Sequence, residues 1–233
     1  MFGLREDLSL DGKQFSWVVS LFYFGQLCSE YPAAYVLSRL RIPTFIGVTI
    51  VVWGAVEMSI GGASNFPGLA AARFFLGFAE AAVSPAFIII TSNWYRRNEH
   101  PIRLAAWVSM NGISQIVGAL LMYAVGGVEN MSIASWRAIF LIFGGLTTAC
   151  GIAFLLMMPK DTTTAWFLNA RERELATRRL AIDRATRDRA EFNKAQMWEA
   201  LRSPLTWMYF YFAICITLPS PILKVAIQFP TRH

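Results

Sequence analysis

The sequence predicts an all-α integral membrane protein, and both its composition and the spacing of its apolar residues support this fold class. Of the 233 residues, 55% are hydrophobic and 15% are charged, whereas a soluble domain carries about 25% charged residues. The apolar residues form blocks that reach or approach the roughly 20 residues needed to cross a bilayer as a helix. Helices satisfy their own backbone hydrogen bonds in lipid. The blocks also lack the alternation over about ten residues that is typical of membrane β-barrel strands.

The chain is predicted to have four parts. Residues 1–13 form a polar N-terminal segment, and residues 14–158 hold five transmembrane helices. These helices correspond to the apolar blocks 15–37, 44–60, 66–94, 104–128 and 138–158. Residues 159–204 form a cytoplasmic central loop. Residues 205–233 contain a shorter apolar block, 207–222, which we interpret as a truncated helix followed by a divergent tail.

The basic residues between the helices predict the orientation of the chain. The first, third and fifth connections are basic, whereas the second has no Lys or Arg and the fourth has only Arg137, near Glu129. The basic residues of the first and third connections are Arg39, Arg41, Arg96, Arg97 and Arg103. By the positive-inside rule these connections face the cytoplasm. The N-terminus is then outside, and we expect a further helix upstream.

The central loop is predicted to contain a helix of its own. Phe167, Leu175 and Leu180 lie among alternating charges, and Glu174 precedes Arg178 by four residues, which favours an ion pair on an exposed helix. We expect an amphipathic helix near the membrane surface. It is either a solvated linker or a site for anionic lipid. A second short helix is expected over 193–204.

Small residues spaced by four predict a tightly packed bundle, because membrane helices associate where small side chains let their backbones approach. The pairs are Gly77/Ala81, Ala105/Ser109, Ser114/Gly118, Gly145/Ala149 and Ala149/Ala153. Pro32, Pro67 and Pro85 permit local breaks in the helices.

A cation and an anion stand in the middle of the apolar block 66–94. Arg73 and Glu80 are seven residues apart, about 10.5 Å along a helix, and they share one helical face with Gly77. A charge at membrane depth is costly and faces the bundle interior or a water-filled cavity. The pair is either a structural lock between helices or part of a substrate and proton pathway. Gly77 leaves room for a ligand or for another backbone.

Other polar residues in the apolar blocks are candidates for the same pathway. Asn111 and Gln115 are four residues apart and so share a face, and Glu30 lies in the first block. Each of them could equally make an ordinary interhelical hydrogen bond. Glu57 lies near the outer end of its helix, where it could simply reach water.

The chemistry of an enzyme or a nucleic-acid-binding protein is not indicated. We find no metal-ligand spacing, no nucleophile motif and no phosphate-binding glycine loop in the sequence, so we predict no enzyme activity, no metal and no cofactor. The net charge is +6, but its sorting by loop points to the bilayer rather than to nucleic acid.

Several stretches resemble the major facilitator superfamily, and more narrowly the fungal allantoate permease group of anion:cation symporters. They include "YPAAYVLSRL", "VVWGAVEMSI", "ARFFLGFAEAAVSPAFIIITSNWYRR" and "SWRAIFLIFGGLTTACGIAFLLMMPKD". The resemblance implies a bundle of twelve helices in two halves, of which this chain holds helices 2–6 and the start of helix 7. A missing C-terminal half-bundle is then an implied partner. The implied location is the plasma membrane.

The resemblance also implies a function and a set of site residues. Members are similar to proton-coupled importers of small organic anions such as allantoate, nicotinate and other carboxylates. Arg73, Gly77 and Glu80 would lie in the pore. Arg39, Arg96, Arg97 and Arg103 would lie in the cytoplasmic loops that form the gate. The first of these loops departs from the superfamily pattern, because Ser38 stands where an acidic residue is expected.

Two functional readings follow. The first is a secondary active transporter, or the N-terminal part of one, that takes up small organic anions together with protons. The second is a non-transporting truncated membrane protein or a gene-model fragment.

Overall fold

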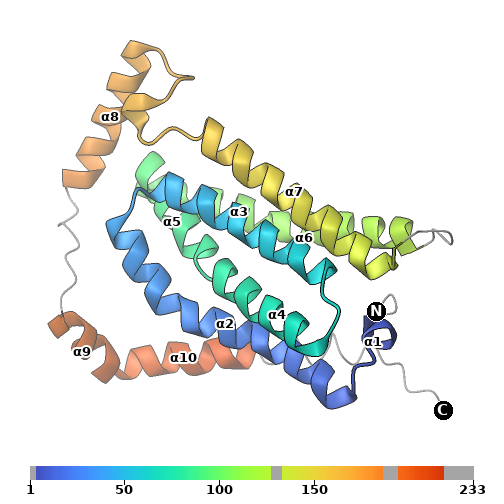
Figure 1. Cartoon of the computed structure of the whole chain (residues 1–233). Helices are drawn as coiled ribbons and strands as arrows, with labels where there is room; N and C mark the ends of the chain where they lie inside the picture. Colours follow the sequence, from blue (N-terminus) through green and yellow to red (C-terminus); the bar gives the residue numbers. More distant parts are fainter. Residues whose placement is uncertain (1–3, 127–132, 186–193, 218–233) are drawn as a thin grey trace. The chain divides into compact units, whose positions relative to one another are not determined.

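The computed structural model describes residues 4–126, 133–185 and 194–217, and within these ranges the chain is helical and contains no β-strand. The all-α prediction is therefore confirmed. The chain separates into two units, residues 1–186 and 187–233. Helices α1 to α8 belong to the first unit, and α9 and α10 belong to the second (Figure 1).

The helices follow the apolar blocks of the sequence closely. Those of the first unit are α1 (Leu4–Asp7), α2 (Gly12–Arg39), α3 (Ile42–Gly61), α4 (Phe66–Glu80), α5 (Val83–Trp94), α6 (His100–Gly126), α7 (Ser135–Met157) and α8 (Ala170–Ala185), with the 3-10 turns η1 (Arg97–Glu99) and η2 (Thr162–Thr164). The second unit contains α9 (Lys194–Arg202) and α10 (Pro204–Thr217).

Four stretches of the described chain are long and apolar enough to cross a membrane. They are Ile42–Gly61, Phe66–Trp94, Arg97–Gly126 and Ser135–Met157, and they match the second to fifth predicted spans. The first predicted span, 15–37, lies within the 28 residues of α2. It is not among these four, because Ser, Gln and Glu side chains lower its mean hydropathy.

The predicted third span is interrupted in the middle. Helix α4 ends at Glu80 and α5 begins at Val83. Pro85 explains the position of this break, because proline has no N–H to donate to the carbonyl group four residues earlier, which is that of Ala81. At its other end α4 is well defined, since the Asn65 side chain accepts a hydrogen bond of 2.9 Å from the Gly68 N–H.

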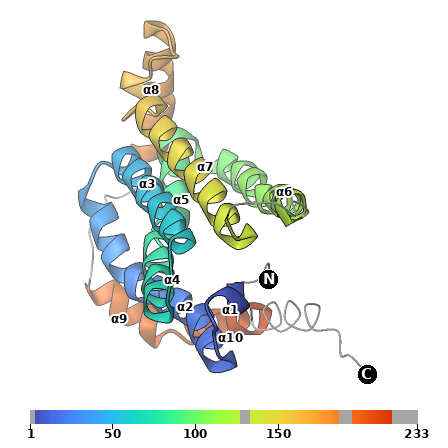
Figure 2. The same ribbon diagram turned by 45° about the vertical axis from the view of Figure 1, so that its right-hand side comes forward.

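Glycines set the distances between the packed helices, and Figures 1 and 2 show α3 beside α7 and α2 beside α4. A Cβ atom added at Gly144 of α7 would lie 2.7 Å from the Gly54 carbonyl oxygen of α3. Added at Gly77 of α4, it would overlap the carbonyl oxygen of Phe22 of α2, and Gly25 of α2 meets the Phe74 carbonyl group in the same way. These contacts are backbone approaches that no larger residue permits.

Not every predicted small-residue contact is made. Gly118 and Gly145 have no neighbouring atom within 4 Å of an added Cβ in the described part of the chain. Helix α6 has no buried residue. The small-residue spacing correctly predicts a close contact at Gly77 but not at these two positions.

The N-terminal segment is tied to the start of α7. The Trp136 indole N–H donates a hydrogen bond of 3.1 Å to Asp7 Oδ2, and Arg137 forms an ion pair of 3.3 Å with the same oxygen. Arg137 also donates to the Gly61 carbonyl group at 3.4 Å. Leu4 and Leu10 are buried beside Trp136 in one apolar cluster, so the segment covers this end of the helices.

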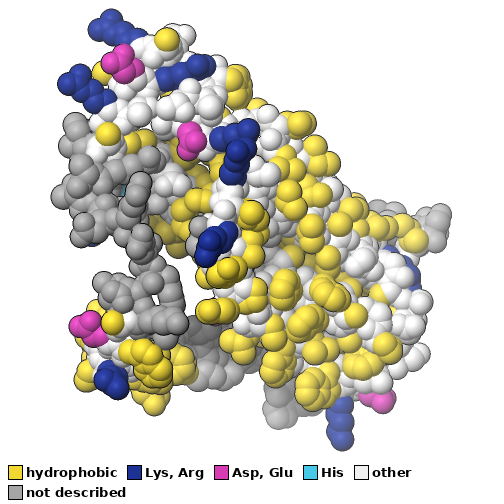
Figure 3. Space-filling view, turned by 60° about the vertical axis from the view of Figure 1, so that its left-hand side comes forward, with side chains coloured by type: hydrophobic (Ala, Val, Ile, Leu, Met, Phe, Trp, Pro, Cys, Tyr) yellow, Lys and Arg dark blue, Asp and Glu magenta, His cyan; other side chains and the backbone are white. Residues whose placement is uncertain are grey.

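The helix of the central loop differs from its prediction. Leu180 of α8 is buried, but Leu175 is 57% exposed, so the apolar side chains do not gather on one face and the helix has little amphipathic character. Among its described side chains Arg179 forms an ion pair with Glu99, whereas the predicted pair of Glu174 with Arg178 is not formed. Figure 3 shows Lys and Arg side chains at the α8 end and a broad apolar surface over the helices.

In the second unit, the expected short helix is α9 and the start of the last apolar block is α10. The Trp207 indole N–H donates to the Leu201 carbonyl group at 2.8 Å, which ties the two helices together. The predicted divergent tail, 218–233, and the side chain of Ser38 lie outside the described residues.

Candidate functional site

Arg73 lies between three helices, at the centre of the candidate site. Helix α4 carries it, and its guanidinium carbon lies 5.3 Å from the centre of the Phe140 ring of α7. Its Nε atom is buried and has no hydrogen-bond partner among the described residues. A buried N–H group without an acceptor is costly, so this donor is available to an anion or to water.

Among the described residues, Glu57 provides a carboxyl group that interacts electrostatically with this cation without forming an ion pair with it. It is half-buried in α3, its side chain forms a hydrogen bond with Thr147 of α7, and it interacts electrostatically with Arg73 and with Glu80. Glu57 is only half-buried, and the packing of α3 against α7 places it in the same polar cluster as Arg73.

Glu80 is half-buried at the last position of α4, immediately before the break at Ala81 and Ala82. It interacts electrostatically with Glu57. Of the two carboxyl groups, that of Glu57 interacts electrostatically with Arg73, although Arg73 and Glu80 share a helix. Among the described residues neither carboxyl group forms an ion pair with Arg73. The cluster consists of one guanidinium group and two carboxyl groups, with Thr147 and Phe140 at its side.

Gly77 does not border an open space. The backbone of α2 at Phe22 fills the position where its side chain would be. Of the two uses that the sequence left open for this glycine, a ligand or another backbone, the structure has the backbone. Gly77 thus holds α4 against α2 and positions Arg73 and Glu80 indirectly.

The other predicted pathway residues are not brought into this cluster. Glu30 is exposed on α2, and Asn111 and Gln115 are exposed on α6. We define the polar cluster between α3, α4 and α7 as Glu57, Arg73, Glu80 and Thr147. The feature of the sequence that indicates Glu57 as a member of this cluster is its acidic side chain within an apolar block.

The four predicted gate residues lie at the other end of the helices from the Asp7–Arg137 contact. Arg39, at the end of α2, lies over the Tyr35 ring at 5.6 Å, and Arg103, near the start of α6, lies over the Tyr95 ring at 3.5 Å. Arg96 precedes η1, and its backbone N–H donates to Glu99 Oε2 at 3.4 Å. Arg97 is exposed in η1.

Comparison with known proteins gives one family. The sequence profile of the Major Facilitator Superfamily matches residues 1–230. The chain is 33% identical to an uncharacterized transporter (C417.10) of Schizosaccharomyces pombe, over 94% of this chain and 43% of the relative. It is 33% identical to the allantoate permease of Saccharomyces cerevisiae, over 94% of this chain and 41% of the permease.

A more distant relative is the thiamine pathway transporter THI73 of Saccharomyces cerevisiae, which is 27% identical over 91% of this chain and 40% of its own length. The chain therefore spans about two fifths of the length of the curated relatives it matches.

Proposed function

Because this chain belongs to the Major Facilitator Superfamily, whose members are integral membrane transporters, we propose that it is the N-terminal part of a secondary transporter that takes up small organic anions together with protons. The allantoate permease among its relatives suggests carboxylates as the substrate class. The observation that carries the proposal is the half-buried Arg73 side chain between α3, α4 and α7, whose Nε atom is buried and has no hydrogen-bond partner among the described residues.

A guanidinium group suits a carboxylate substrate for geometric reasons. Its planar fork of N–H donors matches the two oxygens of a carboxylate. In this proposal Glu57 balances the charge of Arg73 when no substrate is present, which the electrostatic interaction between the two side chains supports. An entering anion would compete with Glu57 for this cation, and the cluster would then hold one negative charge more than before.

A proton taken up with the anion would restore the balance of charge. Two carboxyl groups, Glu57 and Glu80, interact across α3 and α4, and two carboxylates that share a site disfavour being ionised together. Uptake of a proton by one of them would favour substrate binding at Arg73. This is how we propose that the proton and the anion are coupled.

Alternating access requires a second half-bundle. In secondary transporters the substrate site lies near the midplane between two structural repeats that move against each other. We propose that the remaining part of the transporter, which corresponds to the three fifths of the relatives that this chain does not span, closes the site from the other side.

Uptake measurements test the proposal. The chain is expressed alone, and also as a chimera in which it replaces the matching segment of the yeast allantoate permease, in a strain that lacks this permease. We expect uptake of radiolabelled allantoate or nicotinate by the chimera, increased by an inward proton gradient. We expect Arg73→Gln to lower it about ten- to a hundred-fold, as lost charge-assisted hydrogen bonds predict.

The matched control is Arg171→Gln, which removes one positive charge from the exposed side of α8. It should leave uptake within two-fold of the parent, with membrane levels checked by immunoblot. Full uptake by the Arg73→Gln chimera would refute the role of Arg73. A chimera that is present at the membrane but takes up no anion would favour the non-transporting alternative.

A further inference from the structure

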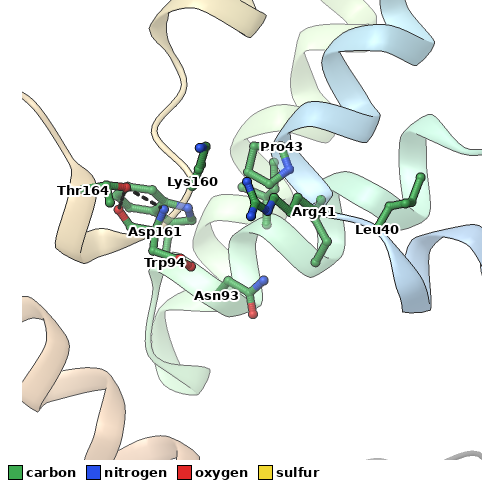
Figure 4. A pocket seen from close by; sticks show the side chains of 10 residues that line it. Leu40, Arg41, Pro43, Asn93, Trp94, Lys160, Asp161 and Thr164 are labelled. Atoms are coloured by element: carbon green, nitrogen blue, oxygen red, sulfur yellow. Dashed lines mark hydrogen bonds between the residues drawn. The ribbon is translucent and has the colours of Figure 1, made fainter.

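A pocket of about 390 Å³ lies at the end of the helices where the basic connections are found. Three separate segments line it: the start of α3, the end of α5 and the turn that follows α7. Figure 4 shows Arg41 on one side of the pocket, Lys160, Asp161 and Thr164 on the other, and Asn93 and Trp94 from α5 beside them. None of these residues belongs to the polar cluster around Arg73.

The pocket carries a net positive charge. Arg41 and Lys160 line it together with one carboxylate, that of Asp161. Both cations are exposed, and within the described residues the ion pairs are formed by Arg137 with Asp7 and by Arg179 with Glu99, so neither Arg41 nor Lys160 takes part in one. Two cations that come from different segments and share one pocket without an ion pair favour an anionic ligand.

The backbone around the pocket also contributes positive charge to it. Helix α3 begins beside the pocket with Arg41 at its N-cap position, and no side chain caps its first turn. The free N–H groups of a helix start carry a partial positive charge. On the opposite side, the Thr164 hydroxyl group and the Asp161 backbone form hydrogen bonds of 3.1 and 3.2 Å. These bonds hold the turn that carries Lys160.

The pocket also lies at the level where lipid headgroups are expected. Helices α3, α5 and α7 all begin or end at this point, and α3 and α7 are each long and apolar enough to cross a membrane. Helix ends of this kind reach the polar headgroup layer of the bilayer, where Trp is enriched, as at Trp94. Apolar residues, including Leu40 and Ile90, complete the lining.

We propose that this pocket binds the phosphate group of an anionic phospholipid, with Arg41 and Lys160 as its cationic contacts. Arg41 offers a planar fork of donors and Lys160 a compact ammonium group, and both are suited to phosphate oxygens. The lipid headgroup then joins the α2–α3 connection to the turn after α7. The inference does not depend on the proposed transport function.

Lipid titration of the purified full chain tests the proposal. The apparent dissociation constants of dioleoyl phosphatidylglycerol and dioleoyl phosphatidylcholine are measured in detergent by native mass spectrometry. We expect the anionic lipid to bind more tightly. Since each Lys or Arg near an anionic lipid surface contributes about a five-fold change in affinity, Arg41→Gln and Lys160→Gln should each weaken binding of phosphatidylglycerol about five-fold. Arg41→Lys should retain most of the affinity.

The matched control is Arg39→Gln. Arg39 is exposed two residues before Arg41 but is not among the residues that line the pocket, so its loss should change the affinity less than two-fold. An equal loss in Arg39→Gln would overturn the proposal in favour of diffuse surface charge. Equal affinities for the two lipids would overturn it as well. If Arg41→Gln does not fold, Lys160→Gln in its exposed turn decides the question alone.

A further experiment tests whether the ligand of the pocket is a lipid or a soluble phosphate compound. Inorganic phosphate at millimolar concentration is added to the complex with phosphatidylglycerol. We expect the lipid to remain bound, because its acyl chains add apolar contacts that inorganic phosphate lacks. Displacement of the lipid, together with a bound phosphate that Lys160→Gln abolishes, would overturn the lipid assignment and identify a soluble phosphate compound as the ligand.

Discussion

The guanidinium carbon of Arg73 lies 5.3 Å from the centre of the Phe140 ring, so a cation in one membrane helix rests on an aromatic face in another. The two residues are 67 positions apart in the sequence, and they meet because α3 packs against both α4 and α7. A cation over an aromatic ring is stabilised by about 0.5–2 kcal/mol, with the larger values where water is excluded.

A double-mutant cycle measures this contact. We expect Arg73→Met and Phe140→Leu to be coupled by about 0.5–2 kcal/mol in the free energy of unfolding, determined by denaturant titration of the detergent-purified chain. Phe154→Leu serves as the control, because Phe154 contacts Phe87, whereas among the described residues Arg73 lies over the ring of Phe140. A coupling energy near zero for Arg73 and Phe140 would show that the contact contributes nothing.

Glycine substitutions test the packing of α2 against α4. An added Cβ at Gly77 overlaps the Phe22 backbone, whereas one at Gly112 of α6 meets no atom within 4 Å among the described residues. Gly77→Ala should therefore lower the free energy of unfolding by about 1–3 kcal/mol, as overpacking does. Gly112→Ala should leave it unchanged or raise it by up to about 1 kcal/mol, because Ala favours the helix.

Thermal unfolding followed by circular dichroism distinguishes the two variants. The melting temperature should fall for Gly77→Ala and hold or rise for Gly112→Ala. A fall of equal size in both variants would mean that Gly77 and Gly112 have the same role, which would contradict the close approach found at Gly77 and not at Gly112.

The helices were the most predictable part of this structure. Apolar blocks at 44–60 and 138–158 became α3 (Ile42–Gly61) and α7 (Ser135–Met157) with shifts of a few residues, because the length of a membrane helix is fixed by bilayer thickness. The interruption of the third span also follows from the sequence, since Pro85 removes one backbone donor.

The composition of the polar cluster was less predictable. Arg73 and Glu80 were found from their place on one helix, but the role of Glu57 depends on how α3 is rotated against α7. Close approach of Gly54 to Gly144 determines that rotation, and a single sequence does not say which glycines face each other. The exposed positions of Asn111 and Gln115 depend in the same way on the packing of α6.

The Asp7 contact gives a prediction for the N-terminal segment. Trp136 is buried and its indole N–H donates to Asp7 Oδ2. Asp7→Ala should lower the free energy of unfolding by about 1–3 kcal/mol, because it leaves this buried donor without an acceptor. Asp7→Asn retains an acceptor and loses only the ion pair with Arg137, whose value at a partly exposed site is below about 1 kcal/mol.

Tryptophan fluorescence during denaturant unfolding measures both variants. Raising the salt concentration should weaken the parent more than Asp7→Asn, since the Arg137–Asp7 ion pair is present only in the parent, whereas both keep the Arg179–Glu99 pair. If Asp7→Asn is as unstable as Asp7→Ala, the charge rather than the hydrogen bond to Trp136 holds the N-terminal segment in place.

Substitution of Glu57 distinguishes an effect on substrate binding from an effect on the rate of transport. In the proposed transport cycle it competes with the substrate anion for Arg73, with which it interacts across α3 and α4. Glu57→Gln removes the competing charge while its amide can still form a hydrogen bond with Thr147, the present partner of the carboxyl group. The substrate should then bind more tightly and leave more slowly.

Uptake by the allantoate permease chimera should accordingly show a lower KM and a lower maximal rate for Glu57→Gln, each by about ten-fold if the lost competition corresponds to one charge-assisted hydrogen bond. Arg73→Lys should act in the opposite direction on KM, because the ammonium group lacks the planar fork. Glu174→Gln, an exposed change on α8, should alter neither value. A raised KM in Glu57→Gln would mean that Glu57 helps to hold the substrate, and the competition at Arg73 would have to be abandoned.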